Sequence, residues 1–560
     1  MRMSDTGDVW WKNAVLYCAD IETFQDSDGD GVGDLRGMTD RIEYLADLGV
    51  TCLWLMPFYP TARKDDGYDI TDFFGVDPHL GTLGDFVELV RTARAHGIRI
   101  IVDFVMNHTS DQHPWFKSAR RSREDPYRDY YVWSRTKPRS SAKDVVFPDE
   151  EDSIWERDDK TGDYYLHHFY KHQPDLNVAN PAVQEEISRT LGFWLELGVS
   201  GFRVDAVPFL FARDGVPGVD DDDAFNPDRY LGDVRSFVTR RVGDAVLLGE
   251  VNLPYPEQRR FFGGDDGDGL NMQFDFIGMQ RFYLSLARGD AGPLAAALRE
   301  RPPLDVTSQW ASFVRNHDEL TLDKLTQKER REVFDAFGPD PDMQLYGRGL
   351  RRRLPPMVSG DERRVRLAYS LMFSLPGTPV LFYGEEIGMG ENLDVPGRLA
   401  VRTPMQWTSA PSGGFSTASP RRLTRPMPDG VWGPEHVNVA DQRRDPGSLW
   451  WFVRSLARRY RQLPASGWAT VEVLDHSVPS VLAHVSRCED WAMLAVHNLG
   501  EEGAVVPLTV ADLPAGARLV DVLGDRPDLD VTASGRFDID LEPYGYRWLL
   551  VVRDGDDPLL

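Results

Sequence analysis

Three carboxylates in this sequence each follow a short apolar segment, and their side chains could support nucleophilic and acid–base chemistry. Asp205 follows Phe-Arg-Val, Glu250 follows Leu-Leu-Gly, and Asp318 follows Arg-Asn-His. A lone Asp after a strand is usually a turn residue or a helix cap. Two carboxyl groups held roughly 5 to 5.5 Å apart, however, are what a glycosidase that retains anomeric configuration requires. We therefore interpret Asp205 as a candidate nucleophile with two companion carboxylates.

The elements that would position these carboxylates are eight short apolar segments, most of them separated by stretches with helical periodicity. The segments are 15–21, 52–56, 99–105, 201–205, 245–251, 270–276, 312–318 and 378–385. Alternating strands and helices predict a parallel sheet, and eight such units predict closure into a (β/α)8 TIM barrel. The stretch 185–197 illustrates the helical pattern, which Gly198 should end. The three carboxylates would then meet at the carboxyl ends of the strands.

We assign residues 1–109 and 175–465 to the barrel. Two further units are predicted around it. The connection after the third strand, residues 110–174, is too long for a simple loop and should form a subdomain over the barrel mouth. Its many aromatic side chains could form its own small core or stack on a sugar. Residues 466–560 alternate like strands between turns and predict a C-terminal antiparallel β-sandwich.

Other polar side chains should reach the same end of the barrel. Those after the second and third strands, together with the arginine before Asp205, are Tyr68, Asp69, Asp103, His108 and Arg203. Asp and His supply the paired acceptors and donors that sugar hydroxyls need. Because side chains alternate along a strand, Arg203 should lie on the same side as Asp205 and keep its carboxylate ionised.

An acidic loop near the N-terminus predicts a structural calcium site. Asp26, Asp28, Asp30 and Asp34 occur at close spacing among glycines, and the backbone carbonyl of Val32 could add a further oxygen. Oxygen ligands at alternate positions of a tight turn suit Ca²⁺, whereas the alternative is a solvated acidic turn.

The composition excludes several classes of partner. The net charge is 63 − 89 = −26, which disfavours nucleic acid and anionic membranes and fits small neutral sugars. We find no apolar signal segment and no transmembrane run, so we expect a cytoplasmic protein. We also expect no organic cofactor. A homo-oligomer is left open.

Five stretches together resemble the α-amylase superfamily of retaining α-glycosidases and transglycosidases. They are Asp103 to His108, Gln173 to Asn177, Gly201 to Asp205, Glu250, and Asn316 to Asp318. The resemblance implies that Asp205 is the nucleophile, Glu250 the general acid/base and Asp318 the carboxylate that stabilises the transition state. Arg203, His108 and His317 would support the glucose ring.

The resemblance also implies that an Asp and an Arg, matched here to Asp69 and Arg402, grip the non-reducing end of the substrate. Such a clamp leaves room for one terminal glucose and favours disaccharides over starch chains. Within the superfamily, the chain is most similar to the enzymes that isomerise maltose and trehalose. The stretches carrying that similarity are 65–70, 315–322, 349–354, 384–390 and 437–446.

The sequence departs from the family pattern at three places. One concerns a possible second calcium site, and two lie where the acceptor sugar would bind. Ala212 replaces a Glu that the family uses with residues matching Asn107, Asp175, Phe209 and Leu210, so we expect a second calcium site to be absent or altered. The stretches 219–227 and 253–257 also differ, and both lie where the acceptor sugar would be chosen.

The sequence is compatible with three functions. The first is maltose–trehalose interconversion with some hydrolysis to glucose. The second is an α-glucosidase or transglucosidase acting on short α-glucosides, and the third is a non-catalytic sugar-binding barrel.

Overall fold

The predicted barrel is present in the computed structural model, which describes residues 9–139, 145–211, 226–264, 266–489, 491–511, 513, 517–524, 526–532 and 535–552. Eight parallel strands close in the order β1-β14-β10-β9-β8-β7-β3-β2. They are β1 (Leu16–Ala19), β2 (Cys52–Leu55), β3 (Arg99–Phe104), β7 (Gly201–Val204), β8 (Val246–Gly249), β9 (Met272–Phe274), β10 (Gln309–Phe313) and β14 (Thr378–Phe382). These eight strands confirm the predicted (β/α)8 fold.

The strands are buried on both faces, as parallel strands covered by helices must be. One close approach requires glycine: Gly201 has φ 144°, and a Cβ there would stand 2.1 Å from the carbonyl oxygen of Val246. Gly201 is paired with Val246 in the register of β7 and β8, so the absence of a side chain allows these two strands to pair at this point. Asp205 and Glu250 follow directly after those strands.

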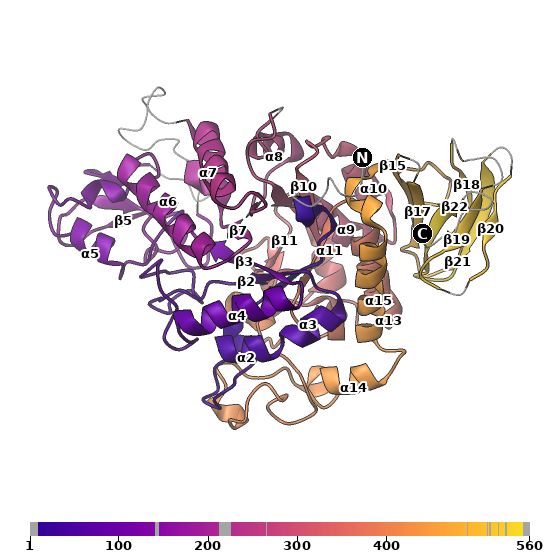
Figure 1. Cartoon of the computed structure of the whole chain (residues 1–560), viewed down its shortest axis with the longest axis horizontal. Coiled ribbons are helices and arrows are strands. Elements are labelled where there is room, and N and C mark those ends of the chain that lie inside the picture. Colours follow the sequence, from indigo (N-terminus) through magenta and orange to yellow (C-terminus); the bar gives the residue numbers. More distant parts are fainter. Residues whose placement is uncertain are drawn as a thin grey trace.

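Helices pack around the strands (Figure 1). They include α3 (Ile42–Leu48), α4 (Leu83–Ala95), α6 (Pro181–Glu196), α7 (Pro227–Arg241), α9 (Phe276–Arg288), α10 (Gly292–Glu300), α11 (Gln327–Phe337), α13 (Glu362–Ser374) and α15 (Leu449–Gln462). The buried residues of α4 and α6 are mostly apolar. The helix predicted over 185–197 begins earlier, because Asn180 caps the amide of Ala182 and Pro181 occupies the first turn. It ends before Gly198, which has φ 98°. The structure therefore corrects the start of this helix and confirms its end.

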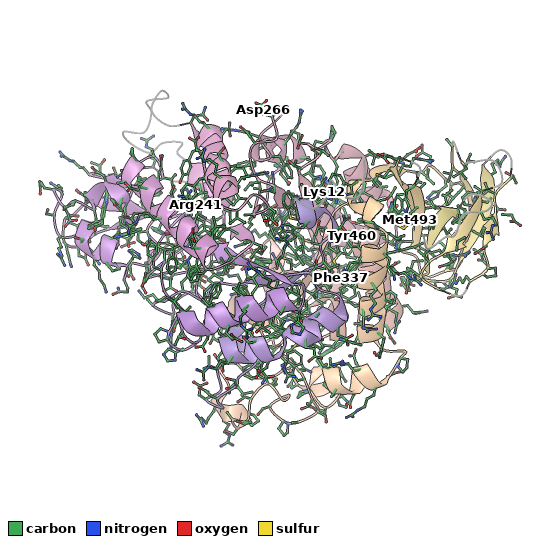
Figure 2. The ribbon with its side chains drawn as sticks, in the orientation of Figure 1. Lys12, Arg241, Asp266, Phe337, Tyr460 and Met493 are labelled. Atoms are coloured by element: carbon green, nitrogen blue, oxygen red, sulfur yellow. The ribbon has the colours of Figure 1, made fainter. Side chains whose placement is uncertain are left out.

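The last helix fastens the barrel to its N-terminal segment. The Tyr460 hydroxyl of α15 donates to the carbonyl oxygens of Lys12 (3.0 Å) and Gly377 (3.1 Å), and Figure 2 shows Tyr460 close to Lys12. None of the described helices has the length and apolar character needed to cross a membrane.

The inserted subdomain and the β-sandwich lie at opposite ends of the longest axis (Figure 1). The former contains α5 (Pro114–Ala119), β4 (Trp133–Ser134), β5 (Trp155–Arg157) and β6 (Tyr164–Leu166). Several of its aromatic rings form their own core, since Phe116 stacks on Trp133 at 5.7 Å and Tyr165 contacts both. Phe147 and Phe169 instead line a cavity at the barrel mouth. The small core predicted for the aromatics is therefore confirmed for part of the set, and stacking on a sugar stays a prediction for Phe147 and Phe169.

The C-terminal unit is antiparallel, as predicted. One sheet has the order β15-β16-β17-β22-β19-β20, and the other is the pair β18-β21. The strands are β15 (Thr470–Val473), β16 (Val481–Cys488), β17 (Trp491–Asn498), β18 (Ala504–Thr509), β19 (Arg518–Asp521), β20 (Leu529–Asp530), β21 (Arg536–Leu541) and β22 (Tyr546–Val552). Apolar side chains such as Leu494 and Ile539 form a core between the sheets. On the outer face of the larger sheet, Trp548 Nε1 donates to Ser370 Oγ of α13 at 3.1 Å, which joins the sandwich to the barrel.

Candidate active site

One buried arginine joins the candidate nucleophile to the candidate acid. Arg203 Nη1 lies 2.5 Å from Asp205 Oδ1 and 2.8 Å from Asp103 Oδ1, and its Nη2 lies 2.8 Å from Glu250 Oε2. Arg203 is 1% exposed and lies over the Trp54 ring, 5.3 Å from its centroid. The predicted side of Arg203 is thus correct, and the structure brings Asp205 and Glu250 together across β7 and β8.

Burial raises the pKa of both carboxyls. The Asp205 pKa is raised to about 6 and the Glu250 pKa to about 7, because desolvation outweighs the attraction of Arg203. Asp205 therefore loses its proton at a lower pH than Glu250. An ionised nucleophile beside a protonated acid is the pair that a double-displacement glycosidase needs.

The pKa of Asp318 is shifted in the opposite direction to those of Asp205 and Glu250. Its Oδ1 accepts from Arg398 Nη1 at 2.6 Å and from Arg402 Nη2 at 2.9 Å, and its Oδ2 lies 3.1 Å from His317 Nε2. These neighbours keep the pKa of Asp318 well below its ordinary value despite burial. A permanently ionised carboxylate is suited to stabilise an oxocarbenium-like transition state. The predicted strand 312–318 ends at Phe313, so Asp318 is carried by the loop after β10.

The predicted substrate-binding residues line the same cavity or support it. The Tyr68 hydroxyl lies 2.7 Å from His317 Nε2 and donates to Asp103 Oδ2 at 3.2 Å. The His108 Nε2 donates to the backbone oxygen of Tyr68 at 3.2 Å. Tyr68 and His108 line the cavity, whereas Asp103 and His317 have no exposed surface and hold the lining side chains from below.

Asp69, which the predicted clamp places on the end of the sugar, has no exposed surface and is not among the described lining residues of the catalytic cavity. The carboxylate of Asp69 turns back into its own loop, where it accepts from Thr61 Oγ1 at 2.6 Å and from the Asp65 amide at 3.1 Å. Arg402 instead pairs with Asp66 at 2.5 Å. The stretch 65–69 contains three aspartates, and only the contacts in the structure show that Asp66 is the one that pairs with Arg402.

Sequence reasoning also missed Asp65 and Arg398. Arg398 Nη2 lies 2.7 Å from Asp65 Oδ1 while its other nitrogen binds Asp318. The four-residue spacing of Arg398 and Arg402 did not mark them as neighbours, because residues three apart share a face in a 3₁₀ turn. Both lie in or at the end of the 3₁₀ segment Gly397–Val401.

The catalytic cavity measures about 520 Å³ and continues past Glu250 towards a polar region. Asn252 and Leu253 line this side, and Asn252 Nδ2 donates to Asp323 Oδ1 at 2.9 Å. Of the divergent stretch 253–257, only Leu253 lies among the described lining residues, because Tyr255 begins α8 (Tyr255–Phe261) and is buried. The stretch 219–225 lies outside the described residues, so its expected part in acceptor choice stays a prediction.

Two described residues matched to the second calcium site, Asn107 and Asp175, contact each other, and the expectation that this site is absent or altered stays a prediction. The Asp175 carboxylate is held by His168 Nδ1 and accepts from Asn107 Nδ2 at 3.3 Å. The His168 ring contacts that of Phe209 at 5.3 Å. Ala212 itself lies outside the described residues.

Comparison with known proteins places the chain in a family. A model of the alpha amylase catalytic domain matches residues 21–333 and 352–465, and one of the sucrose hydrolase-like C-terminal domain matches residues 492–550. The chain belongs to the alpha-amylase family.

Several individual proteins are similar to this chain over most of its length. The trehalose synthase/amylase TreS of Mycobacterium tuberculosis (strain CDC 1551 / Oshkosh) is 43% identical over 497 residues, which cover 88% of this chain and 82% of the relative. The trehalose synthase of Pimelobacter sp. (strain R48) is 38% identical over 551 residues, covering 96% and 95%. The solved trehalulose synthase MutB from Pseudomonas mesoacidophila MX-45 has a TM-score of 0.76 at 28% identity, covering 97% and 99%.

Proposed function

We propose that this enzyme interconverts maltose and trehalose through a covalent glucosyl intermediate on Asp205, with some hydrolysis to glucose. The observation that carries the proposal is the Asp205–Arg203–Glu250 arrangement, with Asp318 ionised beside it. The relatives named trehalose synthase support the same reaction.

In the first step, an oxygen of Asp205 attacks the anomeric carbon while Glu250 gives its proton to the leaving glycosidic oxygen. The anomeric carbon–oxygen bond breaks, a bond to Asp205 forms, and glucose is released in the cavity. In the second step, the anomeric hydroxyl of that glucose attacks, Glu250 takes the hydroxyl proton, and Asp205 leaves. Water attacking instead gives hydrolysis, so retention of glucose in a closed cavity decides the product.

The second candidate is an α-glucosidase or transglucosidase that uses the same residues. The mycobacterial relative is named a trehalose synthase/amylase, which favours keeping this candidate. Time-resolved product analysis with maltose and, separately, with trehalose distinguishes the two. Each sugar should yield the other with minor glucose; dominant glucose or longer oligosaccharides with trehalose untouched would assign the second candidate. A protein inert on every α-glucoside would revive the non-catalytic barrel.

The activity should depend on pH as a bell-shaped curve. Asp205 must be ionised, so kcat/KM should fall below its pKa of about 6, and Glu250 must be protonated, so kcat/KM should fall above its pKa of about 7. Because the two carboxyl groups interact, the acidic and alkaline limbs of the curve report the titration of the pair and not of either group alone. Initial rates on maltose from about pH 4 to about pH 9 check this expectation. A profile flat across neutral pH would contradict the assignment of the two roles.

We also propose that the acidic loop holds a structural Ca²⁺. Oxygens of Asp26, Asp28 and Asp34 lie within 4.8 Å of one another, a spacing that ligands around one Ca²⁺ can adopt. Asp30, also predicted as a ligand, is not in this group, and its carboxylate accepts from the Val32 amide at 2.8 Å. The loop also binds the segment after β14, where the Thr424 amide donates to the Gly31 oxygen at 2.8 Å.

Removing Ca²⁺ should lower the melting temperature by several degrees. A ligand at a hundredfold excess over its Kd stabilises the folded state by about 2.7 kcal/mol. Calorimetry with added Ca²⁺ and with a chelator measures the difference. The difference should vanish in Asp28→Asn and persist in the matched control Asp30→Asn. An equal response in both variants would remove the site from Asp28.

A further inference from the structure

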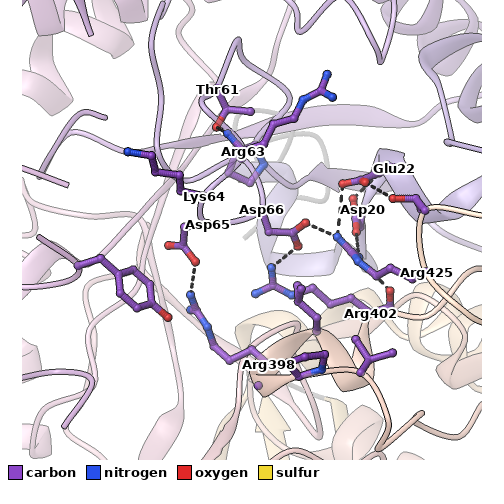
Figure 3. Close-up of a pocket in the computed structure, with 18 of the residues that line it drawn as sticks. Asp20, Glu22, Thr61, Arg63, Lys64, Asp65, Asp66, Arg398, Arg402 and Arg425 are labelled. Carbon is purple, nitrogen blue, oxygen red and sulfur yellow. Dashed lines mark hydrogen bonds and ion pairs between the residues drawn. The ribbon is translucent and has the colours of Figure 1, made fainter. Parts of the chain in front are cut away.

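Arg425 is a buried arginine that is not among the described lining residues of the catalytic cavity. It lines a second cavity at the barrel mouth, which measures about 1050 Å³ and is shown in Figure 3. The side chain is only 6% exposed. Its guanidinium donates to the carboxylates of Asp20, Glu22 and Asp66 and to the backbone oxygen of Arg402. A buried cation with these partners is held in one place by the fold.

Asp66 joins Arg425 to Arg402. Its Oδ1 accepts from Arg425 Nη2, and its Oδ2 accepts from Arg402 Nη1 at 2.5 Å. Burial would raise the pKa of Asp66, but the two arginines lower it to about 2, so the carboxylate stays ionised. The backbone of Asp66 has φ 50°, in the left-handed region that few residues other than glycine tolerate. Asp66 is therefore a fixed, charged bridge between two arginines.

Arg402 is the next link and reaches the catalytic cavity. Its Nη2 donates to Asp318 Oδ1 at 2.9 Å, and its Nε donates to the backbone oxygen of His317 at 2.8 Å. The third nitrogen, Nη1, is the one that binds Asp66. Because a guanidinium is planar and rigid, three contacts in different directions fix its position. The place of Arg402 beside Asp318 therefore depends on Asp66.

The segment that carries Arg425 is fixed from behind. The Thr424 amide donates to the backbone oxygen of Gly31 at 2.8 Å, and the Thr424 hydroxyl donates to Glu22. Arg425 thus stands on the loops that follow β1 and transmits their position to Asp66. Figure 3 shows Asp20, Glu22, Arg425, Asp66 and Arg402 following one another in this order.

Loss of Arg425 would leave Asp66 with Arg402 alone among its described ion pairs. A buried carboxylate that loses a partner is costly, so the guanidinium of Arg402 should turn towards Asp66 and away from Asp318. The missing charge itself would act the other way, because a cation near the site opposes the positive charge that develops on the sugar. A fall in rate would therefore come from the displacement of Arg402.

We propose that Arg425 is a positioning residue: by sharing Asp66 with Arg402, it holds Arg402 against Asp318 and keeps the transition-state carboxylate in place. This inference rests on the proposed function for the role of Asp318.

A double-mutant cycle tests whether Arg425 acts through Asp66. On 4-nitrophenyl α-glucoside, whose leaving group needs little protonation, Arg425→Ala should lower kcat/KM at least about tenfold. Asp66→Asn should lower it as well. Adding Arg425→Ala to Asp66→Asn should then cost less than about threefold more, because the link is already broken. Single losses that multiply in the double variant, or no loss in Arg425→Ala, would overturn the proposal.

The matched control is Arg547→Ala in the β-sandwich. Arg547 is also buried, at 5% exposed, and its Nε lies 2.8 Å from Asp521 Oδ2. This variant should lower the melting temperature and leave kcat/KM unchanged. If Arg425→Ala does not fold, Arg425→Lys carries the same cycle. It keeps the buried charge but not the planar fork, so its loss should be at least about threefold and should vanish in Asp66→Asn.

Binding keeps the test independent of turnover. The iminosugar 1-deoxynojirimycin is a cationic analogue of glucose, and its charge should interact with the ionised Asp318. Calorimetry should show that Arg425→Ala lowers the affinity for 1-deoxynojirimycin, relative to that for glucose, at least about tenfold, and that this loss is absent in Asp66→Asn. An unchanged or higher ratio would contradict the proposal. If the wild-type enzyme converts neither maltose nor trehalose, the proposed function fails, whereas this ratio still decides the role of Arg425.

Discussion

Replacing Asp205 by Asn should lower kcat on maltose and on trehalose by at least about 10⁴-fold, the order of loss seen when a catalytic nucleophile is removed. The amide has almost the same shape as the carboxylate but cannot form the glucosyl ester. Isomerisation and hydrolysis should fall together, because both pass through the same covalent intermediate. Product analysis by chromatography over extended incubation measures both rates in one experiment.

A matched control is available on the neighbouring part of the barrel. Asp275 follows β9 directly, as Asp205 follows β7, but its Oδ1 accepts from the Tyr255 hydroxyl at 2.8 Å and caps Gly278 at the start of α9. Asp275→Asn should lower the melting temperature and leave the chemistry of active molecules intact. Asp205→Asn should remain folded, because Arg203 keeps its contacts with Asp103 and Glu250. Substantial activity in a folded Asp205→Asn protein would exclude Asp205 as the nucleophile.

The positions of Asp205 and Glu250 could be predicted because each follows directly after a buried strand. Strand periodicity and the barrel rule then place both at one face, with no information about loops. The same reasoning placed Arg203 correctly, two residues before Asp205. Local patterns therefore suffice where a side chain is fixed by its own strand.

The contacts made by loops could not be read in this way. Asp65 and Arg398 lie in the connections after β2 and β14, far apart in the chain, and their 2.7 Å pair depends on how those loops cross the barrel mouth. The direction of the Asp69 carboxylate could not be predicted for the same reason, since it accepts from Thr61 in its own loop. Loop geometry depends on packing against distant segments, so spacing alone cannot choose among three neighbouring aspartates.

Strand-borne and loop-borne residues also lie in different places around the catalytic cavity. Asp205 and Glu250 follow their strands directly, whereas Asp318 and the Asp65–Arg398 pair are carried by loops. Asn252 and Leu253 line the cavity beside Glu250. The choice of product should therefore respond to substitutions of Asn252 and Leu253, which leave the bond-breaking residues in place.

Replacing Glu250 by Gln should slow the reaction on maltose by about 10²- to 10⁴-fold, the usual contribution of a general acid/base. A glucose leaving group needs its oxygen protonated, and Gln cannot supply a proton. With 4-nitrophenyl α-glucoside the leaving phenolate needs little protonation, so the first step should remain within about tenfold of the wild-type rate. The second step still lacks its base, so the glucosyl enzyme should accumulate and release one equivalent of nitrophenolate per active site as a burst.

Two observations complete the test of Glu250. Azide attacks without needing a base, so adding it should speed the slow step of Glu250→Gln and give a glucosyl azide of retained configuration. The alkaline limb of the pH profile should disappear, because the group whose burial raises its pKa to about 7 is gone. The matched control is Glu257→Gln on the exposed side of α8, which should leave every rate unchanged. If Glu250→Gln lost the aryl glucoside as severely as maltose, the proton would come from another residue, and the Arg203–Glu250 contact would serve only to position Asp205.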